Sequence, residues 1–272
     1  MTDLPPLRDV LEAHGLSADK RFGQHFLLDL NVTRKIARLA GPFDGDTVIE
    51  VGPGPGGLTR ALLETDASQV IAIEKDRRFI PLLDELADAS DGRLIVIEAD
   101  ALKADELGLL AGRVGHLVSN LPYNVGTPLL IKWLTGPWRP KSLSLMFQKE
   151  VADRVAAPPG ADAYGRLSII AQAVCDARVV MDLPARAFTP PPKVASAVVR
   201  LDPRADPPSP EILSALEKVT AAAFGQRRKM LRSSLKSLGG ADLCEAAGVD
   251  PGARAEVIDV AGFLRLARAA RT

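Results

Sequence analysis

Short apolar runs rich in β-branched residues alternate along this chain with stretches in which apolar residues recur at helical spacing. The runs predict strands at Thr47–Val51, Val70–Glu74, Leu94–Ile97, His116–Ser119 and Leu143–Phe147. The helical spacing predicts helices at Leu58–Glu64, Arg77–Ala87 and Thr127–Leu134. This alternation is typical of a mostly parallel sheet covered by helices on both faces, so we expect an α/β fold.

The pattern changes toward the C-terminus. Val179–Leu183 and Ala195–Leu201 predict two more strands, which we expect to pair antiparallel at an edge of the sheet. Asp202–Pro210 holds four prolines and no apolar period, which indicates a linker. Beyond it, helices are predicted at Glu211–Phe224, Arg227–Ser237, Ala241–Ala247 and Val257–Ala270. We therefore expect an α/β domain with a helical N-terminal extension at residues 1–204 and a small all-α domain at residues 205–272.

Composition narrows the class of protein. With 272 residues and 47% apolar residues, the chain can fill one α/β core and a smaller appendage. Its two cysteines form no CxxC pair and its three histidines are scattered, so we expect neither a disulfide framework nor a metal site. No apolar run reaches the length of about 18 residues that a membrane span needs, and the N-terminus lacks a signal-peptide pattern. We expect a cytoplasmic protein and a monomer.

The glycine-rich letters EVGPGPGG at residues 50–57 lie between a predicted strand and a predicted helix. They satisfy GxGxxG, the fingerprint of dinucleotide binding, although a tight turn without a ligand gives the same letters. Pro53 and Pro55 remove two of the N–H donors that a pyrophosphate would need. S-adenosylmethionine carries no phosphate but has an amino group and a sulfonium, and Glu50 places a carboxylate beside such cations. The turn therefore favours S-adenosylmethionine over NAD.

Two acids follow the next strands. Glu74 ends the second strand, where a carboxylate can accept both hydroxyls of a ribose; the alternative is a solvated charge at the strand end. Asp100 follows the third strand and is placed to accept from an adenine amine; the alternative is a helix N-cap.

Asn120, Leu121, Pro122 and Tyr123 follow the fourth strand. An adenine amine is a poor nucleophile because its lone pair is delocalised into the ring. Two acceptors, the Asn120 side chain and the Leu121 carbonyl, would hold both N–H groups and aim the lone pair at a methyl group. Pro122 stiffens the turn, and Tyr123 offers a face on which an extruded base can stack. The alternative is a turn that merely closes the strand, with Tyr123 in the core.

Several longer motifs identify a family that the sequence resembles. They are RFGQHFL (21–27), EVGPGPGGLT (50–59), DAL (100–102), NLPYNV (120–125), FQKEVADR (147–154), YGRLS (164–168), FTPPPKVASAVVRL (188–201) and FGQRRKMLRSSLK (224–236). Together with Glu74 they resemble the ribosomal RNA small-subunit adenine dimethyltransferases, the KsgA or RsmA family. The resemblance runs from about residue 20 to residue 240 and implies a Rossmann-like S-adenosylmethionine-dependent methyltransferase sheet.

The resemblance also implies an activity and a set of contacts. Members of this family convert two adjacent adenosines near the 3′ end of small-subunit rRNA to N6,N6-dimethyladenosine, and a role in small-subunit biogenesis follows. By motif, the cofactor contacts carry over to His25, Leu27, Gly52, Glu74, Asp100 and Asn120. The family's usual residue at the first of these positions is Asn, so a histidine without a ligand is the alternative there. Phe188 matches a residue expected to sandwich the target base opposite Tyr123, although core packing is its alternative.

The charges of the chain are segregated although Lys plus Arg equals Asp plus Glu, at 34 each. A basic segment without acids holds Arg227, Arg228, Lys229, Arg232 and Lys236, which we expect on one helix facing RNA. Lys193 is a further candidate for phosphate contact. A second, weaker basic cluster comprises Lys20, Arg21, Arg34, Lys35 and Arg38. Ordinary solvated basic faces are the alternative, and the expected partner is rRNA within the assembling small subunit.

Three other functions are weighed against this one. A related antibiotic-resistance methylase acting on large-subunit rRNA is disfavoured by the FTPPPKVASAVVRL block. A ribosome-assembly factor in which methylation is incidental is disfavoured by the intact Asn120–Tyr123 tetrapeptide. An NAD-dependent oxidoreductase is disfavoured by Pro53 and Pro55.

Overall fold

The computed structural model describes residues 4–19, 24–226 and 228–270, and the chain forms two compact units. The first unit consists of Met1–Leu130, Pro140–Ala152 and Val179–Arg200. The second consists of Ile131–Arg139, Asp153–Arg178 and Leu201–Thr272, so it holds two segments that precede the predicted linker. The division into a catalytic domain at 1–204 and an RNA-binding domain at 205–272 stays a prediction.

A seven-stranded sheet has the order β4-β3-β2-β5-β6-β9-β7. Its strands are β2 (Thr47–Val51), β3 (Gln69–Glu74), β4 (Leu94–Glu98), β5 (Gly115–Asn120), β6 (Ser142–Gln148), β7 (Cys175–Leu183) and β9 (Ser196–Pro203). The five strands from β4 to β6 run parallel, so the strands predicted between residues 47 and 147 are confirmed. The two later predicted strands are neighbours at the edge formed by β7. Their antiparallel direction stays a prediction.

A second, two-stranded sheet was not predicted. It pairs β1 (Phe26–Leu27) antiparallel with β8 (Phe188–Thr189) in the first unit. Its strands are too short for a periodic signal, and their partners lie far apart in the sequence.

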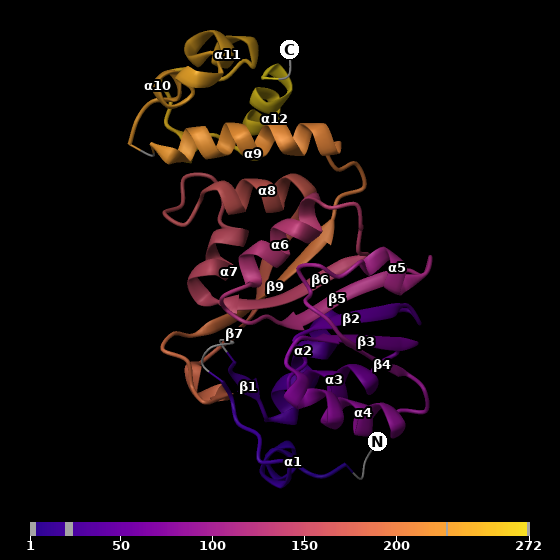
Figure 1. The fold of residues 1–272 in the computed structure, drawn as a ribbon. Helices are drawn as coiled ribbons and strands as arrows, with labels where there is room; N and C mark the ends of the chain where they lie inside the picture. Colours follow the sequence, from indigo (N-terminus) through magenta and orange to yellow (C-terminus); the bar gives the residue numbers. More distant parts are fainter. Residues whose placement is uncertain (1–3, 20–23, 227, 271–272) are drawn as a thin grey trace. The chain divides into compact units, whose positions relative to one another are not determined.

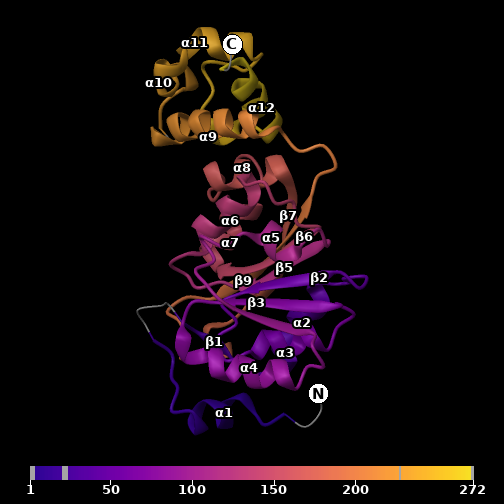
Figure 2. The same ribbon diagram turned by 45° about the vertical axis from the view of Figure 1, so that its right-hand side comes forward.

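Helices connect the strands. In the first 174 residues they are α1 (Leu7–Ala13), α2 (Leu30–Ala40), α3 (Gly57–Leu63), α4 (Ile80–Asp88), α5 (Glu106–Leu110), α6 (Gly126–Thr135), α7 (Lys149–Ala156) and α8 (Arg166–Val174). Figures 1 and 2 show α2, α3 and α4 on one face of strands β2 to β4. Asp29 caps α2 by accepting from the N–H of Asn31 at 2.8 Å, which fixes the start of that helix.

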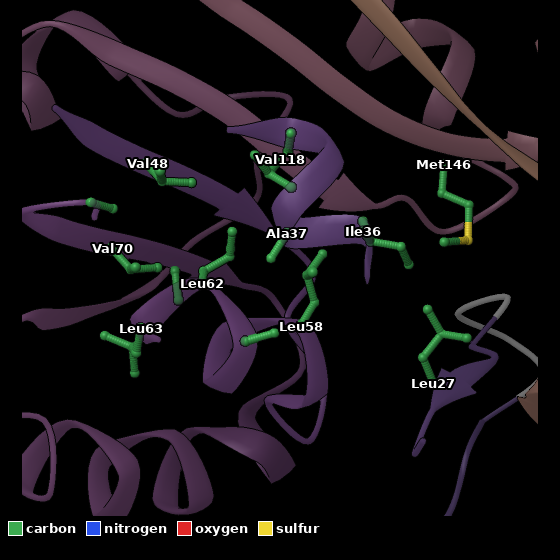
Figure 3. Packing of buried hydrophobic residues seen from close by; sticks show 14 of the residues in the cluster. Leu27, Ile36, Ala37, Val48, Leu58, Leu62, Leu63, Val70, Val118 and Met146 are labelled. Carbon is green, nitrogen blue, oxygen red and sulfur yellow. The ribbon is translucent and has the colours of Figure 1, made fainter. Parts of the chain in front are cut away.

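The main core of the first unit lies between α2, α3 and the parallel strands. Every residue of β2 is buried because the sheet is covered on both faces. The labelled core side chains in Figure 3 are Leu27, Ile36, Ala37, Val48, Leu58, Leu62, Leu63, Val70, Val118 and Met146. Each large aliphatic side chain buried here contributes about 1.5–3 kcal/mol, which holds α3 and the turn before it against the strand ends.

The second unit ends in helices α9 (Pro210–Gly225), α10 (Leu231–Ser234), α11 (Gly240–Ala246) and α12 (Val260–Ala269). Ser209 caps α9, with Pro210 at its first position, so the predicted linker ends where proline begins a helix. A cluster of three aromatic rings, Tyr164, Phe224 and Phe263, packs within this unit, and the hydroxyl of Tyr164 donates to the Ile258 carbonyl at 2.9 Å. The all-helical C-terminal region expected from the sequence is thereby confirmed.

The helix predicted over Arg227–Ser237 is wrong. Arg228 and Lys229 lie in a turn, α10 has four residues, and Lys236 belongs to a separate 3-10 turn, η4 (Lys236–Leu238). The N–H groups of Leu231 and Arg232 donate to carbonyls of Ala253 and Pro251 at 2.8 and 3.0 Å. A continuous helix would need those donors for its own preceding carbonyls, so the tertiary bonds to the 251–253 loop interrupt it.

Over the described stretches of chain, no helix combines the length and the apolarity needed to cross a membrane.

Candidate functional site

A pocket opens where β2 and β5 separate at their carboxyl ends, in the first unit. Strand order reverses between these two strands, which is the switch point where open α/β sheets bind ligands. The pocket encloses about 1150 Å³, part of it open to solvent. Its walls come from residues 24–27, 50–55, 57–58, 73–76, 99–102, 120–125 and 129. The hydroxyl of Ser119 donates to the Val51 carbonyl at 2.5 Å and ties the two strand ends together.

The glycine-rich turn approaches the backbone of residues 24–27 closely. Gly54 has a φ of +53°, which favours glycine. A side chain at Gly57 would collide with the carbonyl oxygen of Leu27, which lies against the start of α3. The turn therefore needs glycine at position 54 for its backbone conformation and at position 57 for the close contact with Leu27.

Glu74 is buried and accepts three backbone N–H groups. The donors are Lys75, Asp76 and Gly54, at 2.8, 2.7 and 3.0 Å. Burial raises the pKa of Glu74 against the opposing effect of these bonds. The carboxylate thus fastens the glycine turn to the end of β3. Because Gly54 already donates to Glu74 and the two prolines of the turn have no N–H, the turn has few donors left for a pyrophosphate.

Glu50 lies at the floor of the pocket and is 1% exposed. The hydroxyl of Thr59 donates to it at 2.6 Å. Burial raises the pKa of Glu50 to about 8, and the nearby charge of Glu74 acts in the same direction. A cationic ligand in the pocket would favour the ionised form of Glu50.

We expect Glu50 to make folding stability depend on pH. Its folded-state pKa of about 8 lies above the ordinary value of 4.5, so the folded chain holds a proton that the unfolded chain releases in this window. The free energy of unfolding should therefore fall as pH rises from about 5 to 8. In Glu50→Gln this loss should be absent, and the stability of the variant relative to the wild type should grow by up to about 1.4 kcal/mol per pH unit. Urea unfolding at several pH values measures the difference, and parallel curves would show that Glu50 is ionised throughout.

Asp100 lies at the side of the pocket with both carboxylate oxygens engaged. Lys75 donates to one at 2.9 Å, and the N–H of Leu102 donates to the other at 3.0 Å. The bond from Lys75 is the main reason that the pKa of Asp100 is lowered. Asp100 therefore caps the turn at 101–103, close to the alternative expected from the sequence, and it also lines the pocket.

Gln24 and Asp76 are pocket residues that the sequence did not single out. The side-chain amide of Gln24 donates to Asp76 at 2.8 Å, and Arg78 pairs with the same carboxylate at 2.6 Å. The bond from Arg78 is the main reason that the pKa of Asp76 is lowered. The one signal in the sequence was an acid two residues after Glu74. Nothing in the local pattern linked it to Gln24.

Asn120 ends β5 and is half-buried at the pocket wall. Its side-chain N–H donates to the backbone carbonyl of His25 at 3.2 Å. This bond orients the amide, so that the side-chain oxygen is the atom left to accept from a ligand. Leu121 and Pro122 line the same pocket, and Pro122 begins the turn into α6 by accepting from Val125 and Gly126.

Tyr123 is also half-buried and lines the pocket, so it is not a fully enclosed core residue. Its hydroxyl shares a hydrogen bond with the Ser196 hydroxyl at 2.6 Å. Its ring lies 5.2 Å from the imidazole of His25, at 31°.

Phe188 lies in the core, which is the alternative that the sequence left open for it. Phe188 is 3% exposed, belongs to the main core of the first unit, and is not among the residues that line the pocket. A role in stacking on a base stays a prediction, and it would require the ring to leave this packing. Lys193, five residues on, is exposed.

The structure brings all six predicted cofactor contacts to this pocket: His25, Leu27, Gly52, Glu74, Asp100 and Asn120. Their roles stay predictions. The predicted basic residues Arg228, Lys229, Arg232 and Lys236 are exposed in the second unit, whereas Arg227 lies outside the described residues. Lys20 and Arg21 lie outside them too, and Arg34 of the second cluster forms a bidentate pair with Glu64.

Taken together, the pocket holds buried acids, one oriented amide and an aromatic face. The acids suit a ligand with positive charge and hydroxyl groups, and the turn suits a ligand without phosphate. The amide oxygen and the ring of Tyr123 suit a planar group that carries N–H donors.

Two close relatives match the chain over nearly its whole length. A "Ribosomal RNA small subunit methyltransferase A" from Phenylobacterium zucineum is 76% identical, over 98% of this chain and 93% of the relative. One of the same name from Caulobacter vibrioides is 77% identical, over 93% of this chain and 97% of the relative.

Two solved structures of related methyltransferases are also similar to this chain. A dimethyladenosine transferase from Plasmodium falciparum has a TM-score of 0.74 and 27% identity, with 89% of this chain and 96% of that chain covered. The 23S rRNA methyltransferase ErmE has a TM-score of 0.68 and 26% identity, with 91% of this chain and all of that chain covered. The family model described as "Ribosomal RNA adenine dimethylase" matches residues 15–271. The chain therefore belongs to the ribosomal RNA adenine dimethylase family and has the Rossmann-like fold of its methyltransferases.

Proposed function

We propose that this protein transfers methyl groups from S-adenosylmethionine to the N6 amines of two adjacent adenosines near the 3′ end of small-subunit rRNA. The names of the two close relatives support the choice of rRNA. The observation that carries the chemistry is the amide of Asn120, oriented by the His25 carbonyl at the wall of an acid-lined pocket.

The work assigned to the chain is positioning. The side-chain oxygen of Asn120 and the carbonyl of Leu121 each accept one N–H of the adenine amine, which turns its lone pair toward the methyl group. Pro122 has no N–H to compete for either acceptor. Tyr123 stacks on the extruded base, and such stacking contributes about 1–3 kcal/mol per base. The methylated ammonium is acidic enough to lose its proton to water, so no strong base is required.

S-adenosylmethionine, when bound, supplies an electrophilic methyl group on its sulfonium. Glu50 favours the positive charge of the cofactor through a carboxylate that already accepts from Thr59. The carboxylate of Glu74 accepts a ribose hydroxyl through the lone pair of Oε2 that its backbone donors leave open. Asp100 accepts from the adenine amine of the cofactor beside Lys75. His25, Leu27 and Gly52 complete the wall.

Glu74→Gln should weaken S-adenosylmethionine binding by about 10-fold or more. The amide replaces one of the two acceptor oxygens with an NH2 donor, which must face at least one of the three backbone N–H groups, so both the ribose contact and the turn are disturbed. Isothermal titration calorimetry measures the affinity, with Glu98→Gln, an exposed acid at the end of β4, as the matched control. An affinity equal to that of the wild type would refute the ribose contact.

The RNA side of the proposal rests on Lys193 and on the basic segment with Arg227, Arg228, Lys229, Arg232 and Lys236. We assign this segment to an RNA-binding domain at residues 205–272, and the catalytic work to residues 1–204. The substrate is rRNA in the assembling small subunit, the protein acts as a monomer in the cytoplasm, and methylation is coupled to subunit biogenesis.

Replacing Arg228 and Lys229 together with alanine should flatten the salt dependence of RNA binding. Each phosphate that the variant no longer neutralises reduces the slope of log K against log salt by about 0.7–0.9. Binding to labelled small-subunit rRNA at several salt concentrations measures the slope. The exposed pair Arg8 and Lys218, changed together, is the control. If the slope is unchanged in the double variant, Arg228 and Lys229 do not contact phosphate.

The test of the whole proposal is incubation with labelled S-adenosylmethionine and small subunits that lack the modification, followed by mapping of the labelled nucleotides. Label on N6 of two adjacent adenosines near the 3′ end is the expected result. Label on large subunits instead would favour a target like that named for ErmE. Stable docking on small subunits without label would favour an assembly factor, and the proposed enzyme would be wrong.

A further inference from the structure

Tyr123 and Ser196 join two of the sequence motifs within the first unit. Tyr123 ends the tetrapeptide that begins at Asn120, and Ser196 belongs to the FTPPPKVASAVVRL block at residues 188–201. Their hydroxyl groups share a hydrogen bond of 2.6 Å between positions 73 residues apart. The ring that we assign to the target adenine is therefore attached at its far end to a residue to which the proposed function gives no role.

Ser196 is held in place by the sheet. It is the first residue of β9, which lies between β6 and β7, and its side chain is fully buried. The residue before it is held as well, because the N–H of Lys149, directly after β6, donates to the carbonyl of Ala195 at 2.9 Å. A buried hydroxyl needs a hydrogen-bond partner, and the hydroxyl of Tyr123 provides one. The sheet thus defines the point at which the phenol is bound.

Tyr123, in contrast, lies in the turn between β5 and α6, outside any strand or helix. Its ring is half-buried at the wall of the pocket and can turn about the two rotatable bonds of its side chain. A hydrogen bond at the far end of the ring restricts both rotations. Burial raises the pKa of Tyr123, so the phenol stays protonated at neutral pH and keeps its O–H for this bond.

We infer that Ser196 is a positioning residue for methyl transfer, whose hydroxyl holds the ring of Tyr123 in the orientation that receives the extruded adenine. This inference rests on the proposed function and extends it to a residue that does not itself line the pocket. The adenine then stacks on a ring that is already ordered. Without the bond to Ser196, the ring would lose its freedom only when the base arrives, and that cost would oppose the stacking.

The expected effect falls on kcat. The subunit docks through phosphate contacts made by basic residues elsewhere, so its KM should depend little on the ring of Tyr123. The ring instead sets the fraction of docked subunits whose adenine is in place. Because ordering one side chain costs an amount equivalent to about 3- to 10-fold in an equilibrium constant, Ser196→Ala should lower kcat by that factor. Its KM for the subunit should stay within about 2-fold of wild type.

The test compares Ser196→Ala, Tyr123→Phe and the double variant in steady-state methylation of small subunits. Each single substitution removes the same hydrogen bond, so the double variant should be no slower than the slower single variant. Falls in kcat that multiply in the double variant would mean that the two hydroxyls act independently, and the inference would be wrong. Ser144→Ala is the matched control, since Ser144 is a buried serine of the neighbouring strand β6 whose hydroxyl accepts from Arg200. It should methylate at the wild-type rate.

Calorimetry with S-adenosylmethionine separates positioning from a general structural role. The Kd and the amount of cofactor bound per chain should match the wild type in Ser196→Ala, because the acids of the pocket are untouched. A loss of bound cofactor as large as the fall in kcat would make Ser196 a residue needed for folding of the pocket and would overturn the inference. An unchanged kcat in Ser196→Ala would overturn it too.

The orientation of the ring can be followed without the reaction. The chain has two tyrosines, so labelling their rings with carbon-13 gives two sets of NMR signals, which Tyr123→Phe assigns. Ser196→Ala should shift or broaden the signals of Tyr123 and leave those of Tyr164 unchanged. Unchanged Tyr123 signals would refute the role of Ser196 even in an active enzyme. If the wild-type protein methylates no adenine while the signals respond as expected, the proposed function fails, and the assignment of Ser196 to methyl transfer fails with it.

Discussion

Asn120→Ala is expected to lower the rate constant of methyl transfer by about 10²- to 10³-fold. The substitution removes one of two acceptors that hold the adenine amine, and preorganised polar groups at a reacting centre contribute effects of this size. Single-turnover transfer of labelled methyl groups to small subunits measures the rate.

The affinity of Asn120→Ala for S-adenosylmethionine should change by no more than a few fold. The acids at the other side of the pocket are untouched, and the amide mainly orients the substrate. Asn31→Ala, an exposed asparagine on α2, is the matched control and should methylate at the wild-type rate. A fast Asn120→Ala enzyme would remove the central role assigned to this amide.

Gly57→Val is expected to have the second large effect. Its side chain would meet the carbonyl oxygen of Leu27 and the side chain of Leu7, so the segment at residues 24–27 must move away from α3. Overpacking of this kind costs about 1–3 kcal/mol of stability. Residues 24–27 line the pocket, and the carbonyl of His25 accepts from Asn120. Because their movement disturbs both, cofactor affinity and methyl transfer should fall together.

Urea unfolding and calorimetry measure both consequences of Gly57→Val. Gly225→Ala is the matched control, since a side chain at Gly225, at the end of α9, would meet no atom within 4 Å. Wild-type stability and affinity in Gly57→Val would mean that the position of residues 24–27 does not depend on their contact with this turn.

The parallel sheet could be predicted because each strand carries its own signal. Thr47–Val51 is predicted and observed with the same bounds, since five consecutive residues favour a strand that is buried on both faces. Helix α9, predicted at Glu211–Phe224 and observed at Pro210–Gly225, also carries its own signal: a capping serine, a proline at its first position and a long apolar stripe.

The prediction of a helix over 227–237 was wrong because contacts with a distant segment decide the structure there. Its basic residues have good helix propensity, but propensity contributes only tenths of a kcal/mol per residue. Two backbone donors at Leu231 and Arg232 bind carbonyls of the 251–253 loop, about 20 residues along the chain, and no local pattern records such bonds. The expected row of cations on one helix face is therefore absent from the described residues of this segment.

The acids and the tetrapeptide of the site were visible in the sequence because the carboxyl ends of adjacent parallel strands meet at one edge. Glu74, Asp100 and Asn120 each end or follow a strand, so the formation of the sheet is enough to bring them to one pocket. Chain connectivity alone made that part predictable.

Only the tertiary structure decided what surrounds them. The bond from Asn120 to His25 joins positions 95 residues apart, and the bond from His25 to Pro190 spans 165 residues. The same long-range packing buried Phe188 and placed His25 beside Tyr123. Local sequence thus determined the strands, the glycine turn and the strand-end groups, because those follow from neighbouring residues. The wall opposite Tyr123 depended on which distant segments pack together, which is a property of the folded chain.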